Sequence, residues 1–256
     1  MLYLGKNFKT AASLNSYKSA VGDFLSVTGL SDLKYATKKE ALFYVNHLEK
    51  RIKEGNYSTH TRNTRVYQLR SVFDEMNLDS NPFSHIIINE PKFVPKGVTI
   101  LPSEIESILS NATGQLLVAI KLALMCGLSV SEICRLSPKS LSFDEHVIVE
   151  GAGFERIIPL PSKLYNDLAG LSSNDGIFVT ARGNKASVRD MQRYLAKITP
   201  YTFQDFRVYA IVHMFCEEIP TERISAYTGI IRNFTSYRNC VHLASPSFFC
   251  YDEIVG

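Results

Sequence analysis

The sequence has no long apolar run, no tryptophan and few cysteines. No stretch approaches the ~18 consecutive apolar residues of a membrane-spanning helix, so no such span is expected. The five cysteines are an odd number without a Cys-x-x-Cys pair, which argues against a zinc site or a disulfide framework and predicts reduced thiols. The N-terminal lysines are not followed by an apolar segment, so no signal peptide is expected. These absences together predict a cytoplasmic protein.

The whole chain has only a small excess of positive charge, but the basic and acidic residues are unevenly distributed along it. The 256 residues are 45% hydrophobic and 21% charged, with a net charge of +3, which is typical of a folded globular protein. Residues 1–96 hold 14 lysines and arginines against 9 acids, whereas residues 97–256 hold 14 against 16. A basic first third favours a polyanionic partner, most simply nucleic acid. An ordinary solvated helix surface would give the same excess.

The first 80 residues have the apolar spacing of three amphipathic helices. These are expected from Ser13 to Thr28, from Thr37 to Gly55 and from Ser58 to Met76. Thr37 with a glutamate three residues later is a capping box. We therefore predict a helical domain over residues 1–90, followed by a linker over residues 91–102, which contain three prolines and one glycine.

The second predicted domain, residues 103–256, is mostly helical with one small antiparallel sheet. A helix starts at Ser103, an apolar helix over residues 116–125 should be buried, and Ser131 is the expected cap of the next short helix. Two strands joined by a turn are expected within residues 147–160 and a third at residues 177–179. Further helices are expected over residues 187–197, 204–215 and 221–227. The last residues, Ser245 to Gly256, are too apolar for a free tail and should dock on this chain or a neighbouring copy.

Several segments, taken in order, match the boxes of a known family. Residues 124–132 (LMCGLSVSE) are similar to a Thr-Gly-Leu-Arg-Ile-Ser-Glu box, and residues 151–161 (GAGFERIIPLP) to a Gly-Lys-Gly-x-Lys-x-Arg-x-x-Pro-Leu hairpin. Phe206 and Arg207 match the end of a His-x-x-Arg box, and the spacing from Arg207 to Gly229 fits a following Leu-Gly-His box. The chain thus resembles the tyrosine recombinase (phage integrase) family. The resemblance implies a helical SAM-like core-binding domain and an integrase catalytic-type domain.

In that family a tyrosine hydroxyl attacks a DNA phosphodiester, and neither a metal nor a cofactor is implied. Two arginines neutralise the charge that grows on the phosphate oxygens, and a hairpin lysine can protonate the leaving oxygen. Most matching positions here lack such groups: Ser129 at the first arginine, Ala152 at the lysine, and Gln204, Val208 and Ile230 at hydrogen-bonding positions.

Some of the family's chemistry could remain. Arg207 matches the second arginine, and Arg135 and Arg232 lie near the altered boxes as possible replacements. Tyr237 is the nearest candidate nucleophile, two residues short of the usual spacing, where Asn239 stands. The resemblance therefore implies a site in which only Arg207, Gln204 and Tyr237 are vestigial catalytic candidates.

Basic residues in both predicted domains are candidate DNA contacts. The set comprises Arg62, Arg65, Arg70, Lys185, Arg189, Arg193 and Arg207. Each could instead lie on a solvated helix face, and Arg207 could form a structural ion pair with Asp205 or Glu132. His213, on an apolar helix, is expected to be a core histidine.

Three functions are compatible with these residues. The first is a sequence-specific, double-stranded DNA-binding regulator without recombinase activity, such as a nucleoid-associated repressor of a phage or mobile element. The second is an active recombinase that uses Tyr237 and Arg207 in a rearranged site. The third is an accessory assembly protein that forms homo-oligomers through its C-terminal tail.

Overall fold

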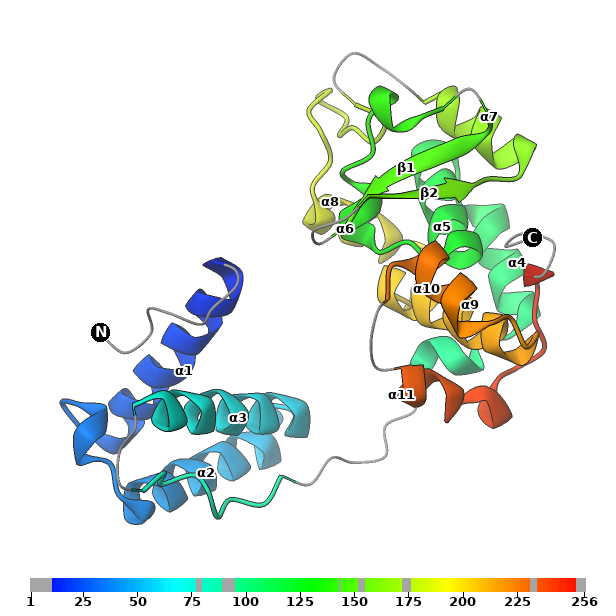
Figure 1. The fold of residues 1–256 in the computed structure, drawn as a ribbon. Coiled ribbons are helices and arrows are strands. Elements are labelled where there is room, and N and C mark those ends of the chain that lie inside the picture. Colours follow the sequence, from blue (N-terminus) through cyan, green and yellow to red (C-terminus); the bar gives the residue numbers. More distant parts are fainter. Residues whose placement is uncertain are drawn as a thin grey trace. The chain divides into compact units, whose positions relative to one another are not determined.

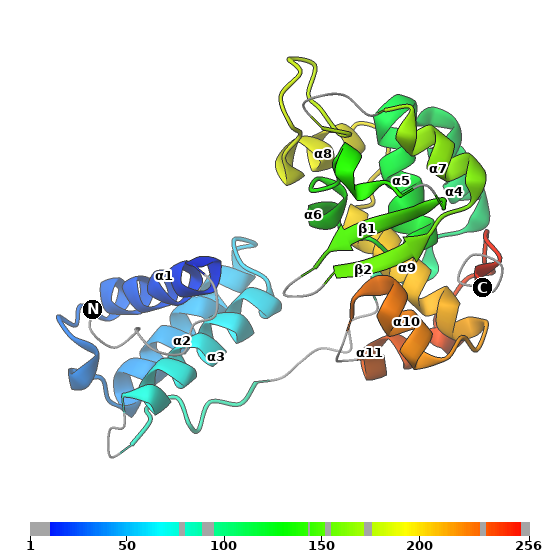
Figure 2. The ribbon, with the colours of Figure 1, turned by 45° about the horizontal axis from the view of Figure 1, so that its top comes forward.

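The computed structural model describes residues 11–76, 80–88, 95–142, 144–151, 155–171, 176–230 and 234–251. The chain divides into two compact units, Met1–Phe93 and Val94–Gly256. Both units are mainly helical (Figures 1 and 2), as the sequence predicted. No helix among the described residues combines the length and apolarity needed to cross a membrane.

The first unit is built from three helices that pack against one another. They are α1 (Ala11–Thr28), α2 (Lys38–Lys53) and α3 (Thr59–Glu75), with a short 3-10 turn, η2 (Leu33–Tyr35), before α2. The capping box expected at Thr37 is present. The ring of Phe24 lies at the centre of the core, in edge contact with Tyr44, Phe73 and Phe83.

The second unit is a helical domain with one hairpin. The apolar segment expected to be buried forms α5 (Gly114–Cys126), which packs along α9 (Phe203–Cys216). The other helices are α4 (Pro102–Asn111), α6 (Val130–Ile133), α7 (Ser162–Ala169), α8 (Val188–Leu195), α10 (Thr221–Thr228) and α11 (Phe234–Arg238); the 3-10 turns are η3 (Lys96–Thr99), η4 (Pro138–Ser140) and η5 (Val241–Leu243).

The sheet consists of two antiparallel strands, β1 (His146–Glu150) and β2 (Glu155–Pro159), with Ile148 opposite Ile157. Residues 152–154 of the connecting turn, including Ala152, lie outside the described residues. Because side chains alternate along a strand, Arg156 and Ile158 of β2 both point inward and are buried. An arginine is thereby placed inside the domain.

Two details of the sequence prediction were wrong. Residues 177–179 are not a strand of the sheet, because Val179 forms only an isolated bridge with Lys185 across a tight turn. The cap of α6 is Ser129 rather than Ser131. Ser129 has the extended backbone of a cap, and its hydroxyl accepts a hydrogen bond from the Glu132 amide at 3.3 Å.

The described part of the C-terminal tail packs on its own unit. Tyr251 is fully buried, and its hydroxyl donates to the Leu124 carbonyl at 2.5 Å. The Phe248 amide donates to the Tyr209 hydroxyl at 2.7 Å. The expected docking therefore occurs within this chain up to Tyr251, and residues 252–256 lie outside the described part.

The entry into the second unit is packed tightly against α9. A methyl group on Gly97, in η3, would lie 2.0 Å from the Asp205 carbonyl oxygen. Only glycine fits this approach of two backbone segments. Since Arg207 is two residues beyond Asp205, this contact fixes the start of the helix that carries it.

Candidate functional site

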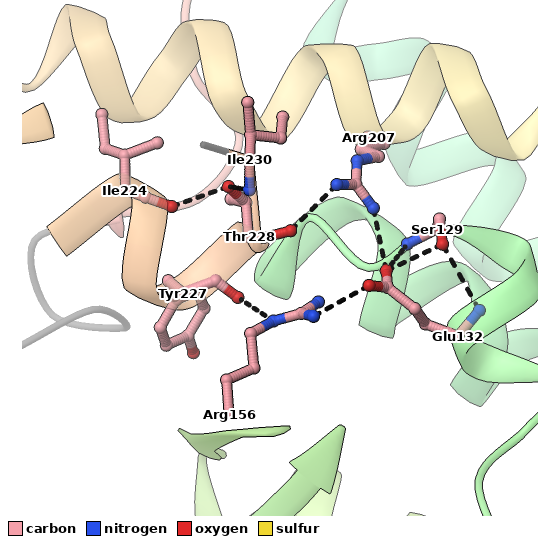
Figure 3. Close-up of polar contacts among 8 residues, drawn as sticks. All are labelled: Ser129, Glu132, Arg156, Arg207, Ile224, Tyr227, Thr228 and Ile230. Carbon is pink, nitrogen blue, oxygen red and sulfur yellow. Dashed lines mark hydrogen bonds and ion pairs between the residues drawn. The ribbon is translucent and has the colours of Figure 1, made fainter. Parts of the chain in front are cut away.

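A single buried carboxylate binds two arginines at the centre of the second unit (Figure 3). Arg156 Nη1 lies 2.8 Å from Glu132 Oε1, and Arg207 Nη1 lies 2.9 Å from Glu132 Oε2. The side chains of Arg156, Glu132 and Arg207 are 5%, 9% and 11% exposed. The Ser129 amide and hydroxyl also donate to Oε2, at 2.8 and 2.7 Å. Four donors thus surround one carboxylate.

Four elements bring these groups together. Glu132 is the third residue of α6 and completes a capping box with Ser129, which fixes its carboxylate at the start of that helix. Arg156 comes from β2 and Arg207 from the first half of α9. Both arginines also donate to carbonyls near the C-terminal end of α10, Arg156 to Tyr227 at 3.1 Å and Arg207 to Thr228 at 2.9 Å.

The electrostatics of the cluster are balanced by these contacts. Burial alone would raise the pKa of the Glu132 carboxyl, but the hydrogen bonds from Arg156 and Ser129 outweigh it and hold the pKa below its usual value. The carboxylate is therefore ionised, and the three side chains carry a net charge of +1. The α10 carbonyls at the negative end of that helix stabilise the remaining positive charge.

Arg156 is enclosed on the side of Gly229. The backbone of Gly229 has a left-handed φ of 72°, and a Cβ there would lie 2.7 Å from Arg156 Nη1. Among the described residues, Arg156 Nη2 is buried without a hydrogen-bond partner. Arg156 and Arg207 thus bind the same carboxylate, one at each oxygen.

Ser129, Val208, Gln204 and Ile230 match positions at which the resembling family has further phosphate-binding side chains, and none of the four is a charged group. Ser129 caps α6, Ile230 packs its side chain on the core, and Val208 is buried. Gln204 lies exposed in the first turn of α9, three residues before Arg207. Ala152, at the position of the hairpin lysine, lies outside the described residues.

Tyr237, the candidate nucleophile, lies on α11 and is half-buried. It packs against the main core and against a small cluster that includes Val208, Val212 and Cys240. The contacts described for Arg207 are with Glu132 and the Thr228 carbonyl. The described contacts therefore do not join the candidate nucleophile to the retained arginine.

The candidate arginines of the first unit are all engaged within it. The Arg62 guanidinium lies 3.0 Å from Glu49, and that of Arg65 lies 3.3 Å from Asp23. Arg70 donates to the Phe83 and Ile86 carbonyls at 3.1 and 2.6 Å. These side chains join the helices to one another and to residues 80–88. A DNA phosphate could bind them only by sharing guanidinium groups that already have partners within the unit.

The candidate residues of the second unit are more exposed. Lys185 and Arg189 both lie on the surface, and Lys185 Nζ lies 3.4 Å from the Arg135 carbonyl, which joins the end of α6 to the turn before α8. Arg135 is also exposed. Arg193 is exposed but pairs with Asp190 at 2.9 Å. Arg232 lies outside the described residues.

Sequence reasoning missed Arg156, and the signal that could have found it was strand alternation. In a strand with one face on the core, alternate residues face inward, so an inward Ile158 would have placed Arg156 on the same face. His213 is a core histidine as expected: it is 1% exposed, and burial lowers its pKa to about 4. The described residues contain no group of three or more histidine, cysteine or acidic side chains that could hold a metal.

Comparison with known proteins gives one related sequence and several related folds. No family model matches the chain. A tyrosine recombinase of Pseudothermotoga lettingae is 32% identical over 157 residues, which cover 57% of this chain and 53% of that protein, so the chain spans about half the length of this relative.

Two solved structures illustrate the structural likeness. One is a lambda integrase dimer bound to a COC' core site, with a TM-score of 0.73 and 17% identity over 92% of this chain and 91% of the other. The second is the Tn1549 transposon integrase in complex with transposon right end DNA, with a TM-score of 0.72 and 18% identity over 92% and 90% of the two chains. These likenesses confirm the predicted fold and the resemblance to the tyrosine recombinases.

Proposed function

From this relationship to the tyrosine recombinases, we propose that the chain binds specific sites on double-stranded DNA without cleaving them. The observation that carries the proposal is the pairing of Arg207 with the buried Glu132 carboxylate, in a site where Ser129 and Ile230 replace charged or proton-donating groups. In this role the protein is a regulator, such as a repressor of a phage or mobile element.

The loss of cleavage follows from the chemistry of phosphoryl transfer. Removing one preorganised donor to a developing oxyanion costs about 10²–10³ in rate, and a general acid contributes roughly 10²–10⁴. The Ser129 hydroxyl already donates to Glu132, and Ile230 has no side-chain donor. Although such effects are not additive, the loss of several together leaves a site that can bind a phosphate better than it can cleave one.

Each unit has a surface suited to DNA. In the second unit, exposed Arg135, Lys185 and Arg189 form a basic surface at the end of α6 and the start of α8. In the first unit, a polar groove lies between α1 and α3; its lining is Ser16, Ser19, His60, Thr61, Thr64, Arg65 and Gln68. Hydroxyl and amide groups of this kind can hydrogen-bond to base edges, while lysines and arginines bind phosphates.

The decisive experiment combines binding with a search for a covalent product. The purified protein is used to select sites from random DNA, and the selected site is compared with random duplex by gel shift over a range of salt concentrations. We expect a preference for the selected site and binding that weakens as salt rises. No preference at physiological salt would contradict the proposal.

The second arm tests for cleavage. The selected site is nicked to trap any phosphotyrosine intermediate, and the wild-type protein is compared with Tyr237→Phe. We expect no covalent complex with either protein. A complex that forms with the wild type and disappears in Tyr237→Phe would establish the second candidate function, an active recombinase, which the 32% identity to a tyrosine recombinase favours.

An accessory assembly role is tested by the tail. Because Tyr251 is buried in the core, the appropriate variant lacks only residues 252–256. If that truncation left DNA binding intact but abolished a stable oligomer, an assembly role would replace the regulatory one.

A further inference from the structure

The outer face of α2 in the first unit presents large apolar side chains to solvent. Leu42 and Phe43 are 55% and 57% exposed, although they are neighbours on a helix that contributes four residues to the core. Tyr35, in the turn before the helix, is 56% exposed as well. A single exposed apolar residue needs no explanation, but adjacent ones on a folded surface are typical of an interaction site.

Two lysines lie on the same face as these apolar residues. Lys38 precedes Leu42 by four residues and Lys39 precedes Phe43 by four, so each lysine is one turn before an apolar side chain. We call Lys38, Lys39, Leu42 and Phe43 the α2 patch. All four are exposed, and they form two parallel ridges, each with a positive charge followed by an apolar group.

Acids close to the α2 patch in sequence are engaged, Glu40 and Asp32 in capping and Glu49 in the pair with Arg62. The Glu40 carboxylate accepts a hydrogen bond from the Thr37 amide at 3.0 Å and another from the Thr37 hydroxyl. Asp32 accepts from the Lys34 amide at 3.0 Å. These carboxylates are held at the helix start, so the patch itself offers a partner only positive and apolar groups.

The α2 patch shares no residue with the polar groove of the first unit. The buried residues of α2, which include Ala41, Tyr44 and Leu48, belong to the core between the three helices, whereas the patch residues are exposed. The groove is lined only by residues of α1 and α3, which both pack against α2. Figures 1 and 2 show the three helices packed in this way. A partner on the patch therefore leaves the groove open.

We propose that the α2 patch docks an acidic amphipathic helix of another protein. Carboxylates of the partner would pair with Lys38 and Lys39, and aliphatic side chains one turn away would cover Leu42 and Phe43. A second copy of this chain fits poorly, because two copies of the patch would bring four lysines into one contact and no patch carboxylate to pair with them. The exposed apolar groups also argue against DNA as the partner, because a surface that binds only phosphates needs no apolar side chains.

The test uses the full chain and two labelled synthetic peptides. One is an amphipathic helix of glutamate and leucine, and the other has lysine in place of each glutamate. Fluorescence anisotropy should show the glutamate peptide binding at least about tenfold more tightly than the lysine peptide. Leu42→Ser with Phe43→Ser should weaken binding of the glutamate peptide by at least about tenfold, and Lys38→Glu with Lys39→Glu should reverse the preference.

A control substitution tests whether any exposed aromatic residue, rather than the α2 patch, binds the peptide. Tyr67 on α3 is 49% exposed, and Tyr67→Ser should leave peptide binding unchanged. Thermal unfolding of every variant checks that the first unit is folded, and DNA binding should be unaffected by the patch variants. Equal binding of the two peptides, or binding that the patch variants do not alter, would overturn the proposal. Self-association in sedimentation that Leu42→Ser with Phe43→Ser abolishes would also overturn it, in favour of a second copy.

Discussion

Arg207 donates to Glu132 across 2.9 Å, in a contact where both side chains are almost fully enclosed. The ion pair was one of two alternatives for Arg207 in the sequence, and it is the one that the structure contains. Because Arg156 holds the other oxygen of the same carboxylate, removal of Glu132 would leave two guanidinium groups unpaired in the interior.

We expect Glu132→Gln to destabilise the second unit strongly. Breaking a buried ion pair by removing one partner costs about 3–5 kcal/mol, since the remaining charge is left uncompensated. Denaturant unfolding measures the change in the free energy of unfolding. Glu106→Gln, an exposed position on α4, is the control and should stay within about 0.5 kcal/mol of the wild type.

Two glycine substitutions should have opposite effects. Gly97→Ala would force a methyl group to within 2.0 Å of the Asp205 carbonyl oxygen, so the melting temperature should fall. Gly22→Ala, within α1, meets no atom within 4 Å and should raise stability by about 0.5–1 kcal/mol because alanine favours the helix. A melting temperature of Gly97→Ala equal to that of the wild type would show that η3 and α9 are not held together as described.

Substitutions of the exposed basic residues of the second unit should affect DNA binding, whereas substitutions of the paired arginines of the first unit should affect stability. If Lys185 and Arg189 contact phosphates, replacing either by alanine removes about one counterion from the salt dependence and leaves stability unchanged. Arg62→Ala should instead lower stability, because it removes the pair with Glu49. Gel-shift titrations at several salt concentrations, together with thermal unfolding, measure both properties.

Stability should fall in mild acid because of His213. The folded protein lowers the pKa of this histidine to about 4 from an ordinary 6.5. Above pH 6.5 the ring is neutral in both states, but between pH 6.5 and 4 the unfolded chain takes up a proton that the folded chain does not. The free energy of unfolding should therefore decrease as the pH falls through this range. His213→Phe should show a smaller decrease than the wild type, whereas His242→Phe, at an exposed position, should behave like the wild type.

Helices were the part of the fold that periodicity could predict. The pattern of α2, with a capping box at Thr37 and a glycine stop at Gly55, contains its own start and end signals, and the structure follows them. Residues 177–179 have the same apolar character as a strand, yet Val179 pairs only with Lys185. Strand pairing depends on what lies alongside, which a short apolar run does not specify.

The site was less predictable, because its contacts join residues far apart in the chain. Arg156 is 24 residues from Glu132, and Arg207 is 75 residues from it. The motif boxes placed Arg207 and Glu132 in one domain. Neither periodicity nor spacing shows which carboxylate or carbonyl a buried arginine binds. That choice depends on tertiary packing around β2, α6 and α9.

The contacts of Ser129 make this position intolerant of a larger basic residue. Arginine at this position would remove the cap of α6, at a cost of about 1 kcal/mol, and with it the hydroxyl that donates to Glu132. It would also add a third guanidinium beside a single carboxylate. An arginine at position 129 would thus lose the contacts that the serine makes and gain no free carboxylate in the cluster.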